Sequence, residues 1–154
     1  MNKFYLLILT ILLAGNFPSS AAVRTWSNGP GINQNWTIAG NWSPSGAPAA
    51  GDTIVFNTGG TITFSTLPGN VSYNSLTILQ GTVILAGANM TMTLGGAAGT
   101  NFTIANGASL TLTNANITMG NGSTASILGT LTVNAGRTYN TSTNTGVTTV
   151  SGTI

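Results

Sequence analysis

The chain has 154 residues, of which 42% are hydrophobic and only 3% are charged. It contains no cysteine and no histidine, and its charged side chains are Lys3, Arg24, Asp52 and Arg137. This composition excludes a disulfide framework and thiol chemistry. It also argues against a nucleic-acid interface, because the formal net charge of +2 comes from isolated residues and not from a basic patch.

The first 22 residues have the pattern of a secretory signal peptide. Lys3 supplies a positive charge, residues 4–14 form a nearly continuous apolar run, and residues 19–22 are small. The run is shorter than the ~20 residues that a membrane-spanning helix needs. We expect cleavage after Ala22, or alternatively after Ala21, and a secreted chain beginning near Val23 that lies outside the cell or on its surface without an integral membrane segment.

Residues 23–51 differ from the rest of the chain. They contain all three tryptophans, Trp26, Trp36 and Trp42, and end in a turn-rich stretch of Pro, Gly and Ala. A repeat protein must cover its end coil, so these residues are predicted to form an N-terminal cap. The alternative is an aromatic platform on which the rings of a carbohydrate stack.

A short phrase recurs from residue 52 to the end. It begins at Gly60, Gly81, Ala108, Gly129 and Gly152, with steps of 21, 27, 21 and 23 residues. A period in the twenties carried by β-type phrases is typical of stacked repeats. The longer step coincides with a glycine-rich stretch at residues 95–99, which we interpret as an enlarged corner.

Each period holds three phrases in which apolar and small polar residues alternate. Three strands per period predict an all-β fold, a parallel β-helix with three sides and a right-handed turn, of about four coils over residues 52–154. An antiparallel sandwich or barrel is the alternative, but hairpins need no threefold phrase within a fixed period. The chain stops two residues into a new phrase, so we expect a truncation at its C-terminal end, or a stack that continues on another molecule.

The alternation assigns side chains to two faces of each strand. The predicted inward set is Ile62, Phe64, Leu76, Ile78, Val83, Leu85, Met90, Met92, Leu94, Phe102, Ile104, Leu110, Leu112, Ile117, Met119, Leu131 and Val133. The predicted outward set is mainly threonine, at Thr61, Thr63, Thr91, Thr93, Thr111, Thr113, Thr130 and Thr132. Threonine suits a solvated strand face.

The tryptophan motifs, the sequence GDTIVF at residues 51–56 and the run of Gly-Thr-apolar-Thr-apolar phrases together resemble a known class of proteins. They are similar to the N-terminal part of large secreted β-helix surface proteins of bacteria, of the adhesin and autotransporter-passenger type, particularly those of Bacteroidetes-like organisms. The resemblance covers the whole chain after residue 22. It implies a parallel β-helix, exposure at the cell surface, and adhesion or contact with carbohydrate.

Catalysis is not expected, because Asp52 is the one carboxylic side chain and no His, Glu or Cys accompanies it. A metal site or cofactor is not expected either. Asp52 and Thr53 match a short Asp-Thr-apolar pattern that resembles the O-glycosylation acceptor of Bacteroidetes-type bacteria, which would place a glycan on Thr53. The alternative is a simple turn before a strand.

The paired threonines suggest one further surface. Thr61 and Thr63, Thr111 and Thr113, and Thr130 and Thr132 begin corresponding phrases and are predicted to align on one side as a hydroxyl array, whereas Thr91 and Thr93 belong to another side. Such an array resembles the ice-contacting face of some solenoid antifreeze proteins. The sequence thus favours a structural or adhesive surface module, with surface glycans or further copies of itself as partners. The alternatives are a binder of carbohydrate or ice, and a subunit of a self-assembling fibre.

Overall fold

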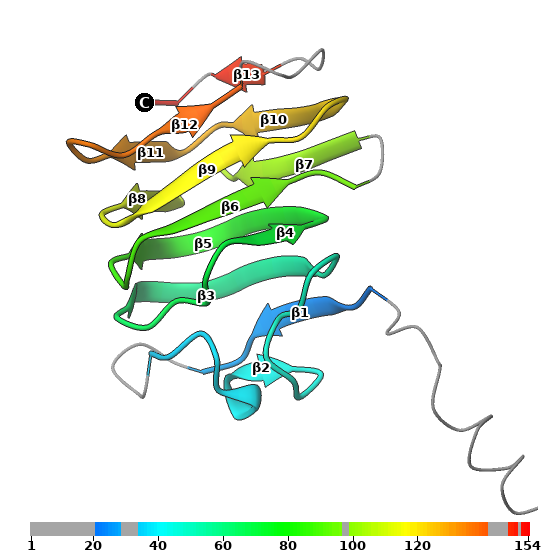
Figure 1. Cartoon of the computed structure of the whole chain (residues 1–154). Coiled ribbons are helices and arrows are strands. Elements are labelled where there is room, and N and C mark those ends of the chain that lie inside the picture. The colour runs from blue at the N-terminus through cyan, green and yellow to red at the C-terminus, as the bar shows by residue number, and fades with distance from the viewer. Residues whose placement is uncertain (1–20, 29–33, 97–98, 142–147, 151) are drawn as a thin grey trace, which may run out of the picture.

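The computed structural model describes residues 21–28, 34–96, 99–141, 148–150 and 152–154. Parallel strands wind into a β-solenoid of about four turns (Figure 1). The strands are β1 (Val23–Trp26), β2 (Trp42–Ser43), β3 (Thr53–Phe64), β4 (Val71–Tyr73), β5 (Ser75–Leu85), β6 (Met90–Leu94), β7 (Gly99–Ile104), β8 (Ser109–Leu112), β9 (Ala115–Met119), β10 (Ser123–Ile127), β11 (Thr130–Val133), β12 (Tyr139–Asn140) and β13 (Thr148–Val150), with one 3-10 turn, η1 (Ala39–Asn41).

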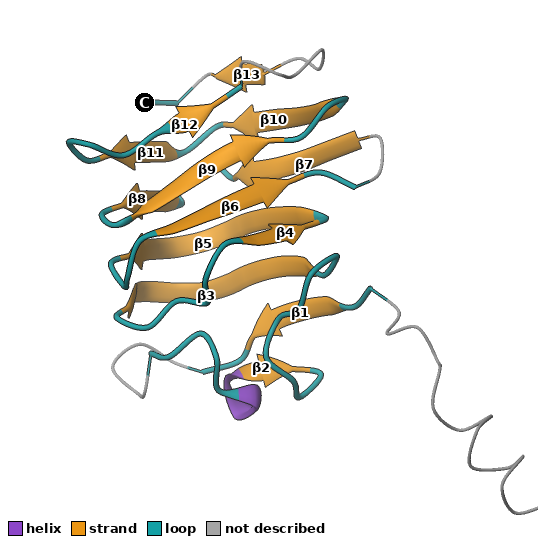
Figure 2. Ribbon diagram, viewed as in Figure 1, coloured by secondary structure: helices purple, strands orange, loops and turns teal. Residues whose placement is uncertain are grey.

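Each coil has three sides (Figure 2). The first side consists of β1, the first halves of β3 and β5, and β7, β10 and β13. The second side consists of the second halves of β3 and β5, together with β8 and β11. The third side is a separate sheet of β4, β6, β9 and β12. Among the strands described, every pairing except β1 with β2 is parallel. The predicted β-solenoid with three strands per period is therefore confirmed, and the antiparallel alternative is wrong.

Successive coils stack with equivalent residues above one another. On the second side, Ile62 pairs with Val83, Val83 with Leu110, and Leu110 with Leu131, and all four side chains point into the core. Every side chain of the predicted inward set is buried except Val133, which packs against the core but stays half-buried at the end of β11. The core also contains Tyr73 and the small residues Ala108, Ala115 and Ala125.

The longest repeat step is taken up at one corner. β4 ends at Tyr73 and β5 begins at Ser75, whereas β6 ends at Leu94 and β7 begins at Gly99. The glycine-rich stretch predicted as an enlarged corner occupies this position, with residues 97 and 98 outside the described part of the chain.

Two segments of residues 23–51 cover the first edge of the solenoid. β1 lies parallel to the first half of β3 and carries β2 on its other side. Along the second half of β3, the side chain of Gln34 accepts a hydrogen bond from the Thr63 N–H, and just beyond the strand Asn35 forms a bridge with Thr66. Unpaired strand edges invite association with other chains; β1 pairs with the first half of this edge, and Gln34 contacts the second half. β1 is thus itself a rung of the first side, one coil before the boundary predicted at residue 52.

Glycine occupies the corner between the first two sides because successive backbones come close there. Gly81 has a φ of 74°, and a Cβ at this position would lie 2.5 Å from the carbonyl oxygen of Thr58 and 2.6 Å from that of Gly60. Two coils later, a Cβ on Gly129 would collide with the carbonyl oxygen of Ala108. At Gly81, the glycine that opens the recurring phrase is therefore required by both dihedral angle and space.

Within the described part of the chain, no helix is long and apolar enough to cross a membrane.

The corner predicts that Gly81→Ala destabilises the fold more than a glycine substitution with the same backbone strain and no close neighbour. Gly122 is the matched control, because its φ is 75° and nothing lies within 4 Å of the position that a Cβ would occupy. Both variants carry the ~1–2 kcal/mol cost of a left-handed alanine, and Gly81→Ala adds an overpacking cost of about 1–3 kcal/mol. Urea denaturation of both variants measures the difference; equal losses would show that the corner has room for a side chain.

Candidate functional site

The outer surface of the second side carries an unbroken column of hydroxyl groups. Thr61 pairs with Thr82, Thr82 with Ser109, Ser109 with Thr130, and Thr130 with Thr153. We call these five residues the threonine column. The next residue along each strand is buried after Thr61, Thr82, Ser109 and Thr130, so these four side chains project outward, and Thr153 is itself exposed. Paired strands place successive members of the column about 4.8 Å apart. The surface can donate and accept hydrogen bonds at regular intervals without carrying charge.

A second outward column runs beside the threonine column and corrects part of the predicted array. Thr63 pairs with Ile84, Ile84 with Thr111, and Thr111 with Thr132. Thr111 therefore aligns with the second threonine of the other pairs and not with the first, and Ser109 occupies the place expected for Thr111. Thr113 lies beyond the end of β8, where its N–H donates to the Leu85 carbonyl oxygen at 3.1 Å.

The other two sides carry hydroxyl groups as well. On the first side, Thr77, Thr103, Ser126 and Thr149 form a column that was not predicted, although the recurring triplets LTI, FTI and ASI place a hydroxyl residue at the same position. On the third side, Thr93 pairs with Ser72 and Thr118. The assignment of Thr91 and Thr93 to a different side from the other pairs is confirmed.

The three tryptophans form an aromatic cluster inside the molecule. Trp26, Trp36 and Trp42 are only 1–2% exposed. The ring centroids of Trp26 and Phe64 lie 4.9 Å apart and those of Trp36 and Trp42 lie 5.0 Å apart, both in edge-to-face geometry. The rings thus cover the first aromatic layer of the core, as a cap does. The carbohydrate platform does not fit this structure, because no tryptophan presents a ring face to solvent.

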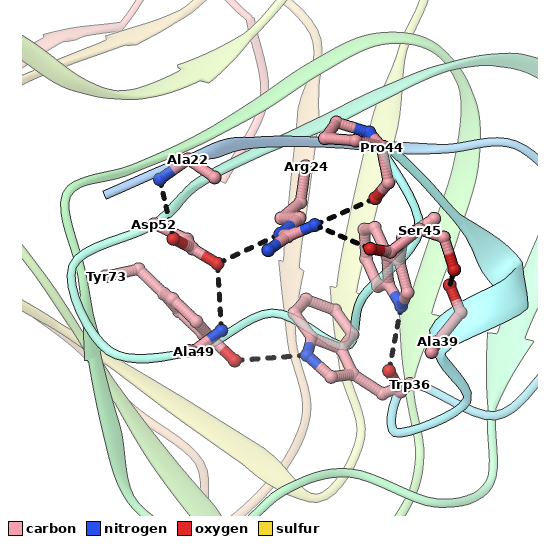
Figure 3. A network of polar contacts seen from close by, with 10 residues as sticks. Ala22, Arg24, Trp36, Ala39, Pro44, Ser45, Ala49, Asp52 and Tyr73 are labelled. Atoms are coloured by element: carbon pink, nitrogen blue, oxygen red, sulfur yellow. Dashed lines mark hydrogen bonds and ion pairs between the residues drawn. The ribbon is translucent and has the colours of Figure 1, made fainter. Parts of the chain in front are cut away.

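Two indole N–H groups of the cluster have buried partners. Trp36 Nε1 donates to the Tyr73 hydroxyl at 3.0 Å, and Trp42 Nε1 donates to the Trp36 carbonyl oxygen at 2.8 Å (Figure 3). Burial raises the pKa of Tyr73 to about 12, although the hydrogen bond from Trp36 acts in the opposite direction. The phenol therefore stays neutral inside the cap.

The carboxylate of Asp52 joins the turn that precedes β3 to the segment that leads into β1 (Figure 3). Its Oδ1 accepts the Ala22 N–H at 2.7 Å, and its Oδ2 accepts the Ala49 N–H at 2.9 Å and Arg24 Nε at 3.3 Å. Burial raises the pKa of this carboxyl, but the hydrogen bonds from Ala49, Ala22 and Arg24 and the charge of Arg24 together hold it below its ordinary value. Asp52 is thus ionised in the folded protein and serves as a structural anion.

Thr53 follows Asp52 and is half-buried at the start of β3. Its Oγ1 accepts hydrogen bonds from Asn74 Nδ2 at 3.1 Å and from the Ser75 hydroxyl at 3.3 Å. These contacts agree with the turn interpretation of the Gly-Asp pair. A glycan on Thr53 stays a prediction from the sequence pattern.

Across the described residues, no group of three or more His, Cys, Asp or Glu side chains is close enough to hold a metal ion. The site residues therefore form strand faces that carry columns of hydroxyl groups, together with a partly buried ion pair and a buried aromatic cap. No family model, no curated protein and no solved structure matches the chain.

The raised pKa of Tyr73 predicts that the protein loses stability in alkaline solution. The unfolded phenol ionises near pH 10 and the folded phenol near 12, so the stability that Tyr73 contributes is complete below pH 10 and is lost as the pH rises toward 12, by about 1.4 kcal/mol per unit. Tyr73→Phe should show a smaller loss over this interval, despite a cost at neutral pH of about 1–3 kcal/mol for leaving the Trp36 N–H without its partner. Urea denaturation at pH 8 and at pH 11 measures both effects; identical pH dependence in the two proteins would contradict the assignment.

Proposed function

We propose that the protein is an exported structural and adhesive module of the bacterial cell surface, and that its second side binds neutral polysaccharide. The observation that carries the proposal is the threonine column, in which five successive rungs present a hydroxyl group to solvent in register. The signal-peptide pattern of residues 1–22 and the resemblance to bacterial β-helix surface proteins support export and surface exposure.

The chemistry of the column favours a neutral polymer as its partner. Hydroxyl groups offer both donors and acceptors to the hydroxyl groups of a sugar, and threonine methyl groups add apolar contact with the ring. Of the charged residues described, Arg24 and Asp52 form an ion pair on the first side, and Arg137 lies in the turn between β11 and β12. Each contact is weak, but a polymer that contacts several rungs at once binds more tightly than a single sugar does, because the contacts are linked.

The test is binding of the full exported chain to insoluble neutral polysaccharides, with cellulose, chitin and mannan as the probes. We expect binding that changes little between low and high salt, because no charge pairs are involved. The double variant T82K and T130K should weaken binding by about fivefold or more, since it removes two hydroxyl groups whose hydrogen bonds are worth ~0.5–1.5 kcal/mol each.

The matched control is the double variant S72K and T118K, which adds the same charge to two rungs of the third side that are separated by the rung of Thr93, as Thr82 and Thr130 are separated by that of Ser109. It should bind as the wild type does. Equal losses in the two double variants, or binding that is confined to anionic polysaccharides and disappears in salt, would contradict the proposal.

Ice is a second candidate ligand, favoured by the regularity of the two outward columns of the second side. Thr63, Thr111 and Thr132 run parallel to the threonine column and make a two-column hydroxyl and methyl array, which Ile84 interrupts once. This candidate predicts thermal hysteresis that is lost when Thr111 and Thr130 are replaced by bulky residues such as tyrosine. A wild-type protein without hysteresis, or hysteresis that survives the replacement, would exclude it.

A further inference from the structure

The carboxylate of Asp52 binds the chain at the point where the chain enters the fold. Asp52 is 2% exposed, and its Oδ1 atom accepts the Ala22 N–H at 2.7 Å. Ala21, one residue earlier, is exposed, whereas the Ala22 carbonyl oxygen already accepts the Thr53 N–H at 2.8 Å as part of the first rung. Ala22 is thus the first of the described residues whose N–H and carbonyl groups both form hydrogen bonds with the solenoid.

We propose that an export peptidase hydrolyses the Ala21–Ala22 peptide bond, and that the new α-ammonium group of Ala22 forms a buried ion pair with Asp52. The inference rests on the export in the proposed function. Water supplies a hydroxyl group to the carbonyl carbon of Ala21, which leaves as a carboxylate, and the Ala22 nitrogen becomes a protonated amine. Ser19 and Ala21 are the small residues that such a peptidase needs at the third and first positions before the cut.

The structure selects this cut over the one after Ala22 that the sequence pattern alone favours. Cleavage after Ala22 would remove both the donor to Asp52 Oδ1 and the acceptor for the Thr53 N–H. Cleavage after Ala21 keeps both atoms in place. It also gives the donor a positive charge, so that the hydrogen bond to the ionised Asp52 becomes an ion pair as well.

The carboxylate has room for two cations. Arg24 approaches Oδ2, at 3.3 Å from its Nε, and Ala22 lies on Oδ1. Arg24 also donates from Nη1 to the carbonyl oxygens of Pro44 and Ser45, at 2.9 and 3.2 Å, so its positive charge is stabilised by these carbonyl groups as well as by Asp52. The other titratable group near this site is the neutral phenol of Tyr73. An ionised carboxylate can accept about four hydrogen bonds, and Asp52 receives three.

The experiment uses the full chain, exported by a bacterial host and purified from outside the cytoplasm. Mass spectrometry identifies the first residue, which we expect to be Ala22. Lys3 is the one lysine of the sequence, so a processed chain has its α-amine as a single reactive amine. An amine-acylating reagent therefore reports on that group alone.

The ion pair should protect the amine. Only the neutral amine reacts, and pairing with a carboxylate raises its pKa above the ordinary 7.7–8.0. At pH 8 we expect acylation in the folded protein to be at least about tenfold slower than in denaturant. The variant Asp52→Asn keeps an oxygen acceptor and removes the charge, so its folded form should lose most of this protection. Comparison of the folded and unfolded wild type decides the question even if that variant does not fold.

The outcomes separate this inference from the proposed function. A chain that keeps Met1, with two reactive amines, overturns export and this inference with it. A chain that is processed but begins at Val23 or elsewhere overturns this inference and leaves export standing. A chain that begins at Ala22 but reacts equally fast when folded and unfolded overturns the ion pair.

Discussion

The register between successive coils is the constraint on which the rest of the structure depends. Side chains alternate between the two faces of a strand, so a shift of one residue would exchange Leu110 with Ser109 and turn a hydroxyl group into the core. The stack of Ile62, Val83, Leu110 and Leu131 inside and the threonine column outside are two consequences of the same alignment. Apolar burial fixes the register, and the register then arranges the surface.

The N-terminal end shows how a repeat stack is completed by residues that do not repeat. The core of the first coil is covered by aromatic rings, the edge of β3 is contacted by β1 and by Gln34, and the backbone of Ala22 is held by Asp52. Each of these contacts solves a different problem of an end coil: the rings cover its apolar surface, β1 and Gln34 bond its exposed backbone groups, and Asp52 fixes the segment that enters it. The ion pair of Arg24 and Asp52 belongs to this end and not to a binding surface.

The solenoid could be predicted from the sequence because the pattern that specifies it, alternating apolar and polar residues, lies within short segments and recurs in every coil. Alternation within a phrase gave the buried set, and the spacing of the phrases gave the pairing of β3, β5, β8 and β11. The alignment of Thr111 was wrong because serine replaces threonine at position 109, so that the visible Thr-x-Thr pair starts two residues late. Residues 23–51 have no period that separates inside from outside. The contact of Ala22 with Asp52 spans 30 residues and leaves no local pattern.

The gathering of the tryptophans at one end has a spectroscopic consequence. Trp26, Trp36 and Trp42 are the three tryptophans of the chain, and all pack beside Phe56 and Phe64 of the first coil. Because each coil of a solenoid contacts only its neighbouring coils, the two ends of the stack need not unfold together. Intrinsic tryptophan fluorescence therefore observes the first coil alone, whereas circular dichroism averages over every strand. Comparison of the two signals therefore distinguishes unfolding of the first coil from unfolding of the later coils without any introduced label.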